Sequence, residues 1–355
     1  RWGPYLSERQ WGTVREDYSD DGSCWEYLPH DHARSRAYRW GEDGLLGICD
    51  RQGRLCFSFA LWNERDPFLK ERLFGLTGPQ GNHGEDVKEE YFYTDGLPTS
   101  SWLCALYKYP HAEFPYDKLV EENAARTQLD PEYELKDTGV FADNRYHDSE
   151  VTYAKADPED VCILLTVHNR GPEEARLHVL PQLWFRNTWS WGREGEGYWP
   201  RGVIKEDGDR QVVAQGADLP PMNLSIDDFD GEYRGTLLTE NDTNTQLLFG
   251  FGDKYACVKD AFHDHVVDGK ADCLSASGQG SKVAFHCVLT VPAGEQRQIR
   301  LRMTRSTAPD QKFGEHFQGV VDERRSDAND FYDEVIGKDA NHEATRIQRQ
   351  AYAGL

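Results

Sequence analysis

Residues 161–185 read VCILLTVHNRGPEEARLHVLPQLWF, and this stretch decides the fold. Residues 161–168 are apolar at nearly every position, which is typical of a strand buried on both faces. A polar turn at 169–174 (NRGPEE) leads into a second strand-like run at 176–185. Two such runs separated by a short turn that contains Gly and Pro predict a β-hairpin.

The same kind of pattern recurs along most of the chain. Apolar residues alternate with polar ones at 283–289 and again at 299–303, on either side of the turn PAGE at 292–295. Further strand candidates are 54–62, 211–215, 222–226, 246–251 and 255–258. Many short strands joined by turns predict a mainly β fold, a large antiparallel β-sandwich. One helix is expected to interrupt it at 116–127, after Pro115.

The pattern changes after Pro309. Apolar residues then recur at helical spacing from Phe313 to Ile336, and again from Ala344 to Leu355 behind a cap at Asp339 or Asn341. We therefore expect a sandwich domain at 1–306, followed by a helical linker at 307–355.

Composition excludes several classes of function. The 355 residues include 62 acidic and 40 basic ones, for a net charge of −22. Nucleic acids and anionic membranes need a basic face, so neither is expected as a partner. No segment approaches the roughly 20 apolar residues of a membrane span, and no signal peptide is visible. Cys56, Cys162 and Cys287 lie in apolar runs and are expected to be buried free thiols, so we expect a cytoplasmic protein.

Three segments carry the side chains that sugar binding requires. Residues 2–44 combine Trp and Tyr with Arg and carboxylates, residues 78–86 form a Gly-rich polar loop, and residues 184–199 hold an aromatic cluster. Aromatic rings stack on the apolar faces of a sugar, while charged groups bond its hydroxyls. Each segment also has a structural interpretation: a strap held by Trp packing, a solvated hairpin tip, and an inter-domain patch. The candidate substrate-binding residues are Trp11, Arg15, Glu16, His32, Asn82, His83, Glu85 and Trp189.

Metal binding is not expected. His30 and His32, and also His263 and His265, would share a face if they lay on strands, but no third ligand is suitably spaced. The loop at 226–232 (IDDFDGE) lacks the closing Glu of a calcium loop. We predict neither a metal nor a cofactor, and no nucleophile signature is present.

Several long motifs resemble the amino-terminal half of glycoside hydrolase family 63, bacterial enzymes related to processing α-glucosidases. The motifs span the chain: WGPYLSERQWGTVREDYS (2–19), PHDHARSRAYRWGEDG (29–44), ERLFGLTGPQGNHGEDVKE (71–89), LYKYPHAEFPY (106–116), EYELKDTGVFADNRY (132–146), LPQLWFRNTWSWG (180–192) and RIQRQAYAGL (346–355).

The resemblance implies a super-β-sandwich joined by linker helices to an (α/α)6 barrel. In such enzymes the barrel carries the acid and base carboxylates that hydrolyse an α-glucosidic bond with inversion. The barrel is absent from this chain, so the resemblance assigns it no catalytic residue. It implies two partners: the barrel of the same protein, and an α-glucoside or oligosaccharide substrate.

Two other functions stay open. A stand-alone carbohydrate-binding module would use the same aromatic segments without any barrel. A mutarotase-like sugar epimerase would use His83 and Glu85 as acid and base.

Overall fold

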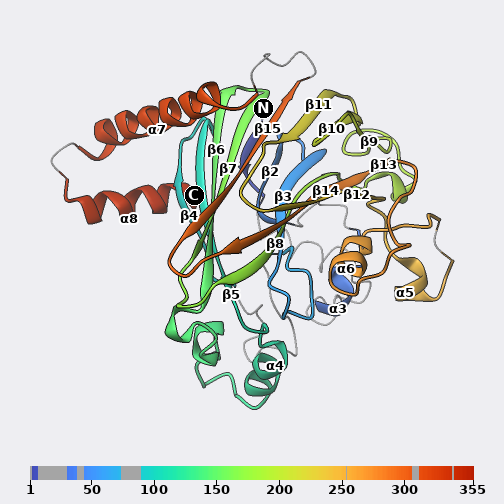
Figure 1. The fold of residues 1–355 in the computed structure, drawn as a ribbon, viewed down its shortest axis with the longest axis horizontal. Helices are drawn as coiled ribbons and strands as arrows, with labels where there is room; N and C mark the ends of the chain where they lie inside the picture. The colour runs from blue at the N-terminus through green and yellow to red at the C-terminus, as the bar shows by residue number, and fades with distance from the viewer. Residues whose placement is uncertain are drawn as a thin grey trace.

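The computed structural model describes residues 2–6, 30–37, 44–72, 89–252, 254–305, 312–337 and 340–355. Two large antiparallel sheets lie face to face, with helices on their outer sides (Figure 1). The predicted mainly β sandwich is confirmed.

The smaller sheet has six strands in the order β1-β2-β3-β8-β14-β12. Their bounds are β1 Trp2–Tyr5, β2 Leu45–Asp50, β3 Leu55–Trp62, β8 Ala175–Phe185, β14 Lys282–Val291 and β12 Glu232–Thr239. The strands predicted at 54–62, 176–185 and 283–289 are confirmed as β3, β8 and β14.

The larger sheet has nine strands in the order β13-β9-β10-β11-β15-β7-β6-β5-β4. Their bounds are β13 Gln279–Gly280, β9 Val203–Glu206, β10 Gln211–Gly216, β11 Leu219–Ile226, β15 Gln296–Arg305, β7 Asp160–Asn169, β6 Tyr146–Asp157, β5 Trp102–Pro110 and β4 Tyr91–Gly96. The strands predicted at 161–168, 211–215, 222–226 and 299–303 are confirmed in it.

The main core fills the space between the two sheets. Phe57 and Phe285 of the smaller sheet pack in one apolar cluster with Tyr153 and Leu301 of the larger one. The Tyr153 hydroxyl donates to the Leu46 carbonyl at 2.6 Å, which links the sheets through the core. The inward-facing side chains of both sheets thus form the core of the sandwich.

The predicted hairpin at 161–185 is wrong, because β7 and β8 belong to different sheets. β7 pairs with β6 and β15, whereas β8 pairs with β3 and β14. The turns at 169–174 and 292–295 both cross between the sheets. Gly294 N donates to the Asn169 carbonyl at 3.1 Å, and Asn169 N donates to Glu295 O at 2.9 Å, so the two crossings support each other.

Helices cover the two outer faces. On the larger sheet, α7 (Glu315–Ile336) buries Phe317 and Val321 against Trp102 and Cys162, and α8 (His342–Ala353) runs beside β4 (Figure 1). The predicted terminal helices are thus confirmed. Of the two proposed caps, Asn341 begins α8, since its Oδ1 accepts from Glu343 N at 2.8 Å.

On the smaller sheet, α6 (Ala261–Val266) packs Phe262 against Leu180 and Ala284. The short helices α3 (His30–Ala33) and α5 (Thr245–Phe249) lie near it (Figure 1). The strand predicted at 246–251 is therefore wrong: Asn244 Oδ1 caps α5 by accepting from Leu247 N at 2.8 Å, and Leu247 and Phe249 are exposed. Residues 255–258 form no strand either.

The helix predicted at 116–127 is confirmed as α4 (Tyr116–Ala124), three residues shorter than expected. Short 3₁₀ helices occur at η2 Leu135–Thr138, η3 Ala142–Asn144 and η4 Trp189–Trp191.

The cysteines behave as predicted. The seven that the structure describes are free, and Cys56, Cys162 and Cys287 are buried. Within the described ranges, no helix has the length and apolar character to cross a membrane. The domain division at residue 306 stays a prediction.

Candidate functional site

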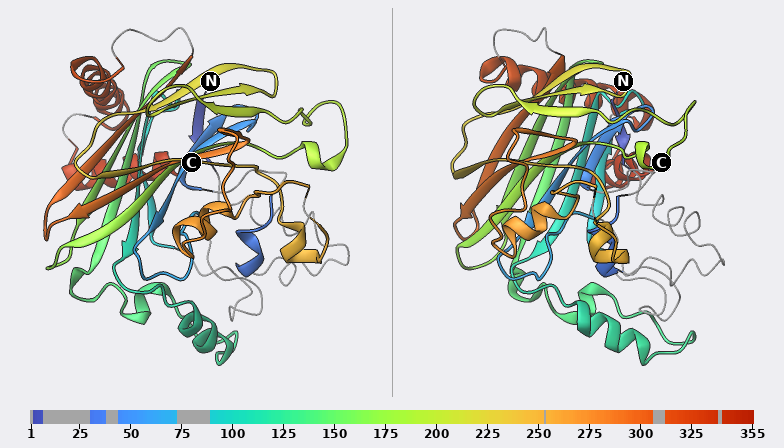
Figure 2. Two further views of the ribbon diagram at one scale, coloured as in Figure 1. Left: turned by 45° about the vertical axis from the view of Figure 1, so that its right-hand side comes forward. Right: turned by 90° about the vertical axis from the view of Figure 1, so that its right-hand side faces the viewer.

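A cleft of about 640 Å³ opens beside η4, the turn after β12 and the end of the α3 segment. We call it the tryptophan cleft. Its walls include Trp189, Trp191 and Tyr255, together with Asp242 and the cations Arg36 and Lys254. In Figure 2 (left view), the loop with η4 and helix α5 project on the side where α3 lies.

Trp189 is held by hydrogen bonds. Its indole Nε1 donates to Asp242 Oδ2 at 3.2 Å. Asp242 Oδ1 also accepts from Ser190 Oγ and from Asn187 Nδ2, both at 3.1 Å. One carboxylate therefore orients three donors, and it sets the plane in which the indole ring lies.

Asn187 and Thr188 tie the loop to the sandwich, and both are buried. Asn187 Nδ2 donates to the Asn241 carbonyl at 2.8 Å, and its Oδ1 accepts from Ser190 Oγ at 2.7 Å. Thr188 Oγ1 accepts from Trp199 N at 2.9 Å and so closes the loop at its far end. Buried polar groups that satisfy one another in this way make a rigid wall.

Cations lie over the aromatic rings of the cleft. The Arg201 guanidinium lies 4.6 Å from the centre of the Tyr255 ring, and Lys254 Nζ lies 5.2 Å from it. Arg36 lies 5.6 Å from the centre of the Phe249 ring. These cation–π contacts hold the Tyr255 and Phe249 rings in place before a ligand binds.

The described lining of the cleft supplies aromatic rings and hydrogen-bonding groups. Among the described residues that line it, Asp242 is the one that carries a carboxylate. Glycoside hydrolysis uses two carboxyl groups on opposite sides of the scissile bond. The Asp242 oxygens are also occupied by the loop donors, so Asp242 serves as a positioning residue.

The structure describes two of the predicted site residues, Trp189 and His32. Trp189 lines the cleft. His32 is exposed on α3 and does not line it, although Arg36 and Ala37 of the same segment do. The other candidates, Trp11, Arg15, Glu16, Asn82, His83 and Glu85, lie outside the described residues.

The aromatic cluster predicted at 184–199 divides into two parts. Trp184 is buried on β8 against Leu6 and Cys56, whereas Trp189 and Trp191 reach the cleft. Asn187 and Asp242 were missed from the sequence. A run of turn-forming polar residues after an apolar strand, ENDTN at 240–244, was the available signal.

Both His-x-His patterns lie on short helices rather than strands. His30 and His32 belong to α3, and His263 and His265 belong to α6, so residues two apart do not share a face. No group of three potential metal ligands occurs among the described residues. Burial, aided by Lys70 and Arg72, holds the pKa of His30 well below its usual value.

A cluster of buried charges lies behind α3. Lys70 pairs with Glu89, and Glu71 pairs with Lys282 at 3.3 Å and with Arg72 at 3.1 Å. Burial alone would raise the pKa of Glu71, but Lys282 and Arg72 outweigh it and lower the pKa to about 2. Lys259 Nζ donates to the Ala33 carbonyl at 3.2 Å, which connects α3 to the segment that follows the cleft.

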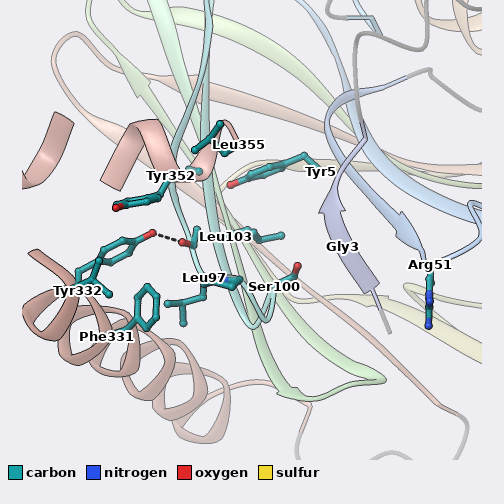
Figure 3. A pocket seen from close by; sticks show the side chains of 14 residues that line it. Gly3, Tyr5, Arg51, Leu97, Ser100, Leu103, Phe331, Tyr332, Tyr352 and Leu355 are labelled. Carbon is teal, nitrogen blue, oxygen red and sulfur yellow. Dashed lines mark hydrogen bonds between the residues drawn. The ribbon is translucent and has the colours of Figure 1, made fainter. Parts of the chain in front are cut away.

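A second cavity, of about 670 Å³, lies between the terminal helices and the edge of the sandwich. Phe331 and Tyr332 of α7 face Tyr352 of α8 and Leu97 and Leu103 around β4 and β5 (Figure 3). The Tyr332 hydroxyl donates to the Gly96 carbonyl (Figure 3). Val335, Tyr352 and Leu355 are exposed, so the rim of this apolar cavity is open.

Comparison with known proteins gives one sequence relative. No family model matches the chain. The chain is 38% identical over 397 aligned positions to the uncharacterized protein YMR196W of Saccharomyces cerevisiae, and the alignment covers 100% of this chain and 36% of the yeast protein. The chain thus spans about a third of the length of this relative.

Three of the solved structures with some similarity are carbohydrate-active enzymes. A polysaccharide lyase matches 74% of this chain and 27% of its own, at 13% identity and a TM-score of 0.32. A family GH92 alpha-mannosidase of Bacteroides thetaiotaomicron, in complex with mannoimidazole, matches 84% of this chain and 27% of its own at 9% identity, with a TM-score of 0.25. A family GH92 inverting mannosidase of the same organism matches 81% of this chain and 35% of its own chain at 10% identity, with a TM-score of 0.18. At these TM-scores, none of the three carries an argument about function.

Proposed function

We propose that this chain is the amino-terminal, non-catalytic β-sandwich part of an inverting α-glucoside hydrolase similar to glycoside hydrolase family 63. In this proposal the tryptophan cleft supplies a sugar-binding wall. The observation that carries it is the Trp189 indole, which Asp242 holds in a cleft with Trp191 and Tyr255. Fixed aromatic rings beside hydrogen-bonding groups suit the two kinds of surface on a sugar.

The catalytic groups would come from another part of the protein. Inverting hydrolysis needs two carboxyl groups about 6.5–9.5 Å apart, with room for a water between one of them and the sugar. The described lining of the tryptophan cleft offers Asp242 alone, and that carboxylate is engaged by its own loop. A second domain, the (α/α)6 barrel that the sequence motifs imply, would supply the pair.

The apolar cavity at α7 and α8 supports such a partner. Exposed Val335, Tyr352 and Leu355 at its rim form the kind of apolar patch that protein surfaces present to other protein parts. The length of the yeast relative, of which the chain matches 36%, is in keeping with a longer parent protein.

Two assays test the proposal. The 355-residue chain should bind gluco-oligosaccharides in calorimetry, with binding reduced by Trp189→Ala, and should not release glucose from α-glucosides. The parent protein with its further domain should hydrolyse them and give the β-anomer first, which NMR of the fresh product detects. Turnover by the 355-residue chain, or retention of configuration by the parent, contradicts the proposal.

A stand-alone carbohydrate-binding module is the second candidate. The favouring observation is that residues of this chain, Asp242 and Asn187, already hold the Trp189 loop in place. If so, the chain alone binds oligosaccharide as tightly as any longer form of the protein. The epimerase alternative stays a prediction, since His83 and Glu85 lie outside the described residues, and anomer exchange followed by NMR decides it.

A further inference from the structure

A separate polar cavity of about 450 Å³ lies where the chain leaves β3 and β5 and crosses from β7 to β8. We call it the charged cavity. Three guanidinium groups (Arg65, Arg145, Arg176) and three carboxylates (Glu64, Glu173, Glu174) line it, together with His111. It shares no lining residue with the tryptophan cleft.

Glu64 is held in an unusual position at the wall of this cavity. Its backbone has a φ of 65°, a left-handed conformation that is costly for any residue with a Cβ. Such strain persists where the surrounding contacts enforce it, and it is common at functional sites. The enforcing contacts both reach Oε1, from His178 Nε2 at 3.0 Å and from Arg176 Nη1 at 3.1 Å.

A second imidazole orients the first. His178 Nδ1 is hydrogen-bonded to His286 Nε2 at 2.9 Å, and both rings are buried on the outer face of the smaller sheet. With Nε2–H of His178 directed to Glu64, its Nδ1 accepts from His286. This chain of hydrogen bonds from His286 through His178 fixes Oε1 of Glu64. Among the described residues, Oε2 has no hydrogen-bond partner.

Two buried asparagines make the walls rigid. Asn63 Nδ2 donates to the carbonyls of Pro110 and Ala112 at 2.7 and 2.8 Å, and its Oδ1 accepts from Arg65 N at 2.9 Å. Asn169 Nδ2 donates to the carbonyls of Glu173 and Val291 at 2.7 and 2.8 Å. Because the turns are already tied down, a ligand does not have to order them.

Gly171 allows the His111 ring to reach its place. A Cβ on residue 171 would lie 2.8 Å from His111 Cε1, closer than real contacts allow. His111 Nε2 is buried without a hydrogen-bond partner in the described structure. Such an atom is one that a bound hydroxyl or water would satisfy.

The charges of the cavity balance. Arg145 and Glu173 bond each other twice, at 3.1 and 2.8 Å, and so neutralise each other. Burial lowers the pKa of His111 to about 4, so its ring is neutral near pH 7. A cavity with no net charge but many donors and acceptors favours a neutral ligand rich in hydroxyls over an anion or a cation.

We propose that the charged cavity binds a small neutral polyhydroxylated molecule, a single sugar residue or a polyol. Glu64 Oε2 and the Glu174 carboxylate accept hydrogen bonds from its hydroxyls. The Arg65 guanidinium, which has no ion pair or hydrogen bond among the described residues, donates to its oxygens. Apart from His111, no aromatic ring lines the described cavity, so the hydroxyls rather than a stacked face identify the ligand.

NMR of the His111 ring tests the inference on the whole 355-residue chain. The ¹H–¹³C resonance of the ring is recorded while glucose or glycerol is added. We expect a saturable shift. Arg65→Ala should weaken the apparent affinity by about tenfold or more, because a hydrogen bond from a charged group is lost. The matched control Arg346→Ala removes an exposed arginine on α8, paired with Glu343, and should leave the affinity unchanged.

Three results overturn the inference: no saturable shift with either compound, an unchanged affinity in Arg65→Ala, or tighter binding of inorganic phosphate or glucuronate than of glucose. The Trp189 indole N–H resonance, followed in the same titration with gluco-oligosaccharide added, reports the tryptophan cleft separately. A shift at Trp189 without one at His111 overturns this inference and leaves the proposed function standing. A shift at His111 alone supports this inference and counts against the proposed sugar-binding wall.

Discussion

Lys70 Nζ lies 2.8 Å from Glu89 Oε1, and the two side chains are 4% and 0% exposed. The same ammonium donates to the Tyr116 hydroxyl at 2.6 Å, and Tyr107 donates to Glu89 Oε2 at 2.8 Å. Burial raises the pKa of Glu89, while Lys70 and the hydrogen bonds oppose that change. The pair joins positions 70 and 89 in the interior of the protein.

Breaking this pair should strongly destabilise the protein. Glu89→Ala leaves the Lys70 ammonium buried without its carboxylate, which costs about 3–5 kcal/mol in the free energy of unfolding. Urea denaturation measures it. Glu343→Ala is the control, since it removes an exposed pair with Arg346 and should cost less than about 1 kcal/mol. If the two substitutions lowered the free energy of unfolding equally, the buried Lys70–Glu89 pair would not have this stabilising role.

Stability should fall in mild acid because of His147. The residue is fully buried, neither ring nitrogen has a hydrogen-bond partner in the described structure, and its ring centre lies 4.3 Å from that of His111. Burial, aided by His111, lowers its pKa from the usual 6.5 to about 3. Between those values the unfolded chain binds a proton that the folded chain does not, so each pH unit of acidification removes up to about 1.4 kcal/mol.

His147→Phe should reduce this pH dependence, because a ring that does not titrate then occupies the site. Urea denaturation near pH 7 and near pH 5 gives the slope for both proteins. Because the imidazole nitrogens lack partners, the substitution should cost little near pH 7. An unchanged slope would show that other groups account for the loss of stability.

The Asp242 carboxylate should matter to sugar binding through Trp189. Asp242→Ala leaves the indole N–H without its acceptor and removes one of the two acceptors of the Asn187 amide, and this should destabilise the protein by about 1–3 kcal/mol. Trp189→Ala should lower the affinity for gluco-oligosaccharide by about tenfold with a smaller effect on stability. Calorimetry and thermal melting separate the two quantities. Leu129→Ala, at a fully exposed position outside the cleft, is the control and should change neither.

Arg349 should hold α8 against β4. Its Nε donates to Asp95 Oδ1 at 3.1 Å and its Nη1 donates to Asn329 at 2.8 Å, whereas none of the residues of α8 is itself buried. Arg349→Ala should therefore open α8 locally by roughly 1.5–3 kcal/mol, the range for hydrogen bonds to charged groups. Hydrogen exchange of residues 342–353 should rise while that of β14 stays slow. If hydrogen exchange of residues 342–353 stays at the wild-type rate in Arg349→Ala, Arg349 does not hold α8 in place. Arg346→Ala is the control and should leave this exchange unchanged.

Local patterns predicted seven of the fifteen described strands and both terminal helices. The strands predicted at 54–62, 161–168 and 299–303 are confirmed, and most of their side chains are buried. Helical spacing likewise predicted α7 and α8. The pattern misled at 246–251, where the run was too short to separate a helix from a strand and Asn244 supplied a helix cap.

The site was predicted less completely. Trp189 stood out because a cluster of aromatics after a strand is unusual, but Asp242, about 50 residues further on, contacts it only through the fold. The same holds for the hydrogen bond between Glu64 and His178. These residues are 114 positions apart, and neither local sequence indicates that they meet.

The sequence by itself determined the mainly β class, the net negative charge, the buried thiols and the positions of about half of the described strands and of the terminal helices. Those depend on burial and local propensity, which each segment carries with it. Tertiary structure decided that β7 and β8 enter different sheets, because a turn determines where a chain reverses and not which sheet receives it. It also decided which polar side chains meet at Trp189 and at Glu64, since those contacts join segments whose separation in the sequence says nothing about their distance in space.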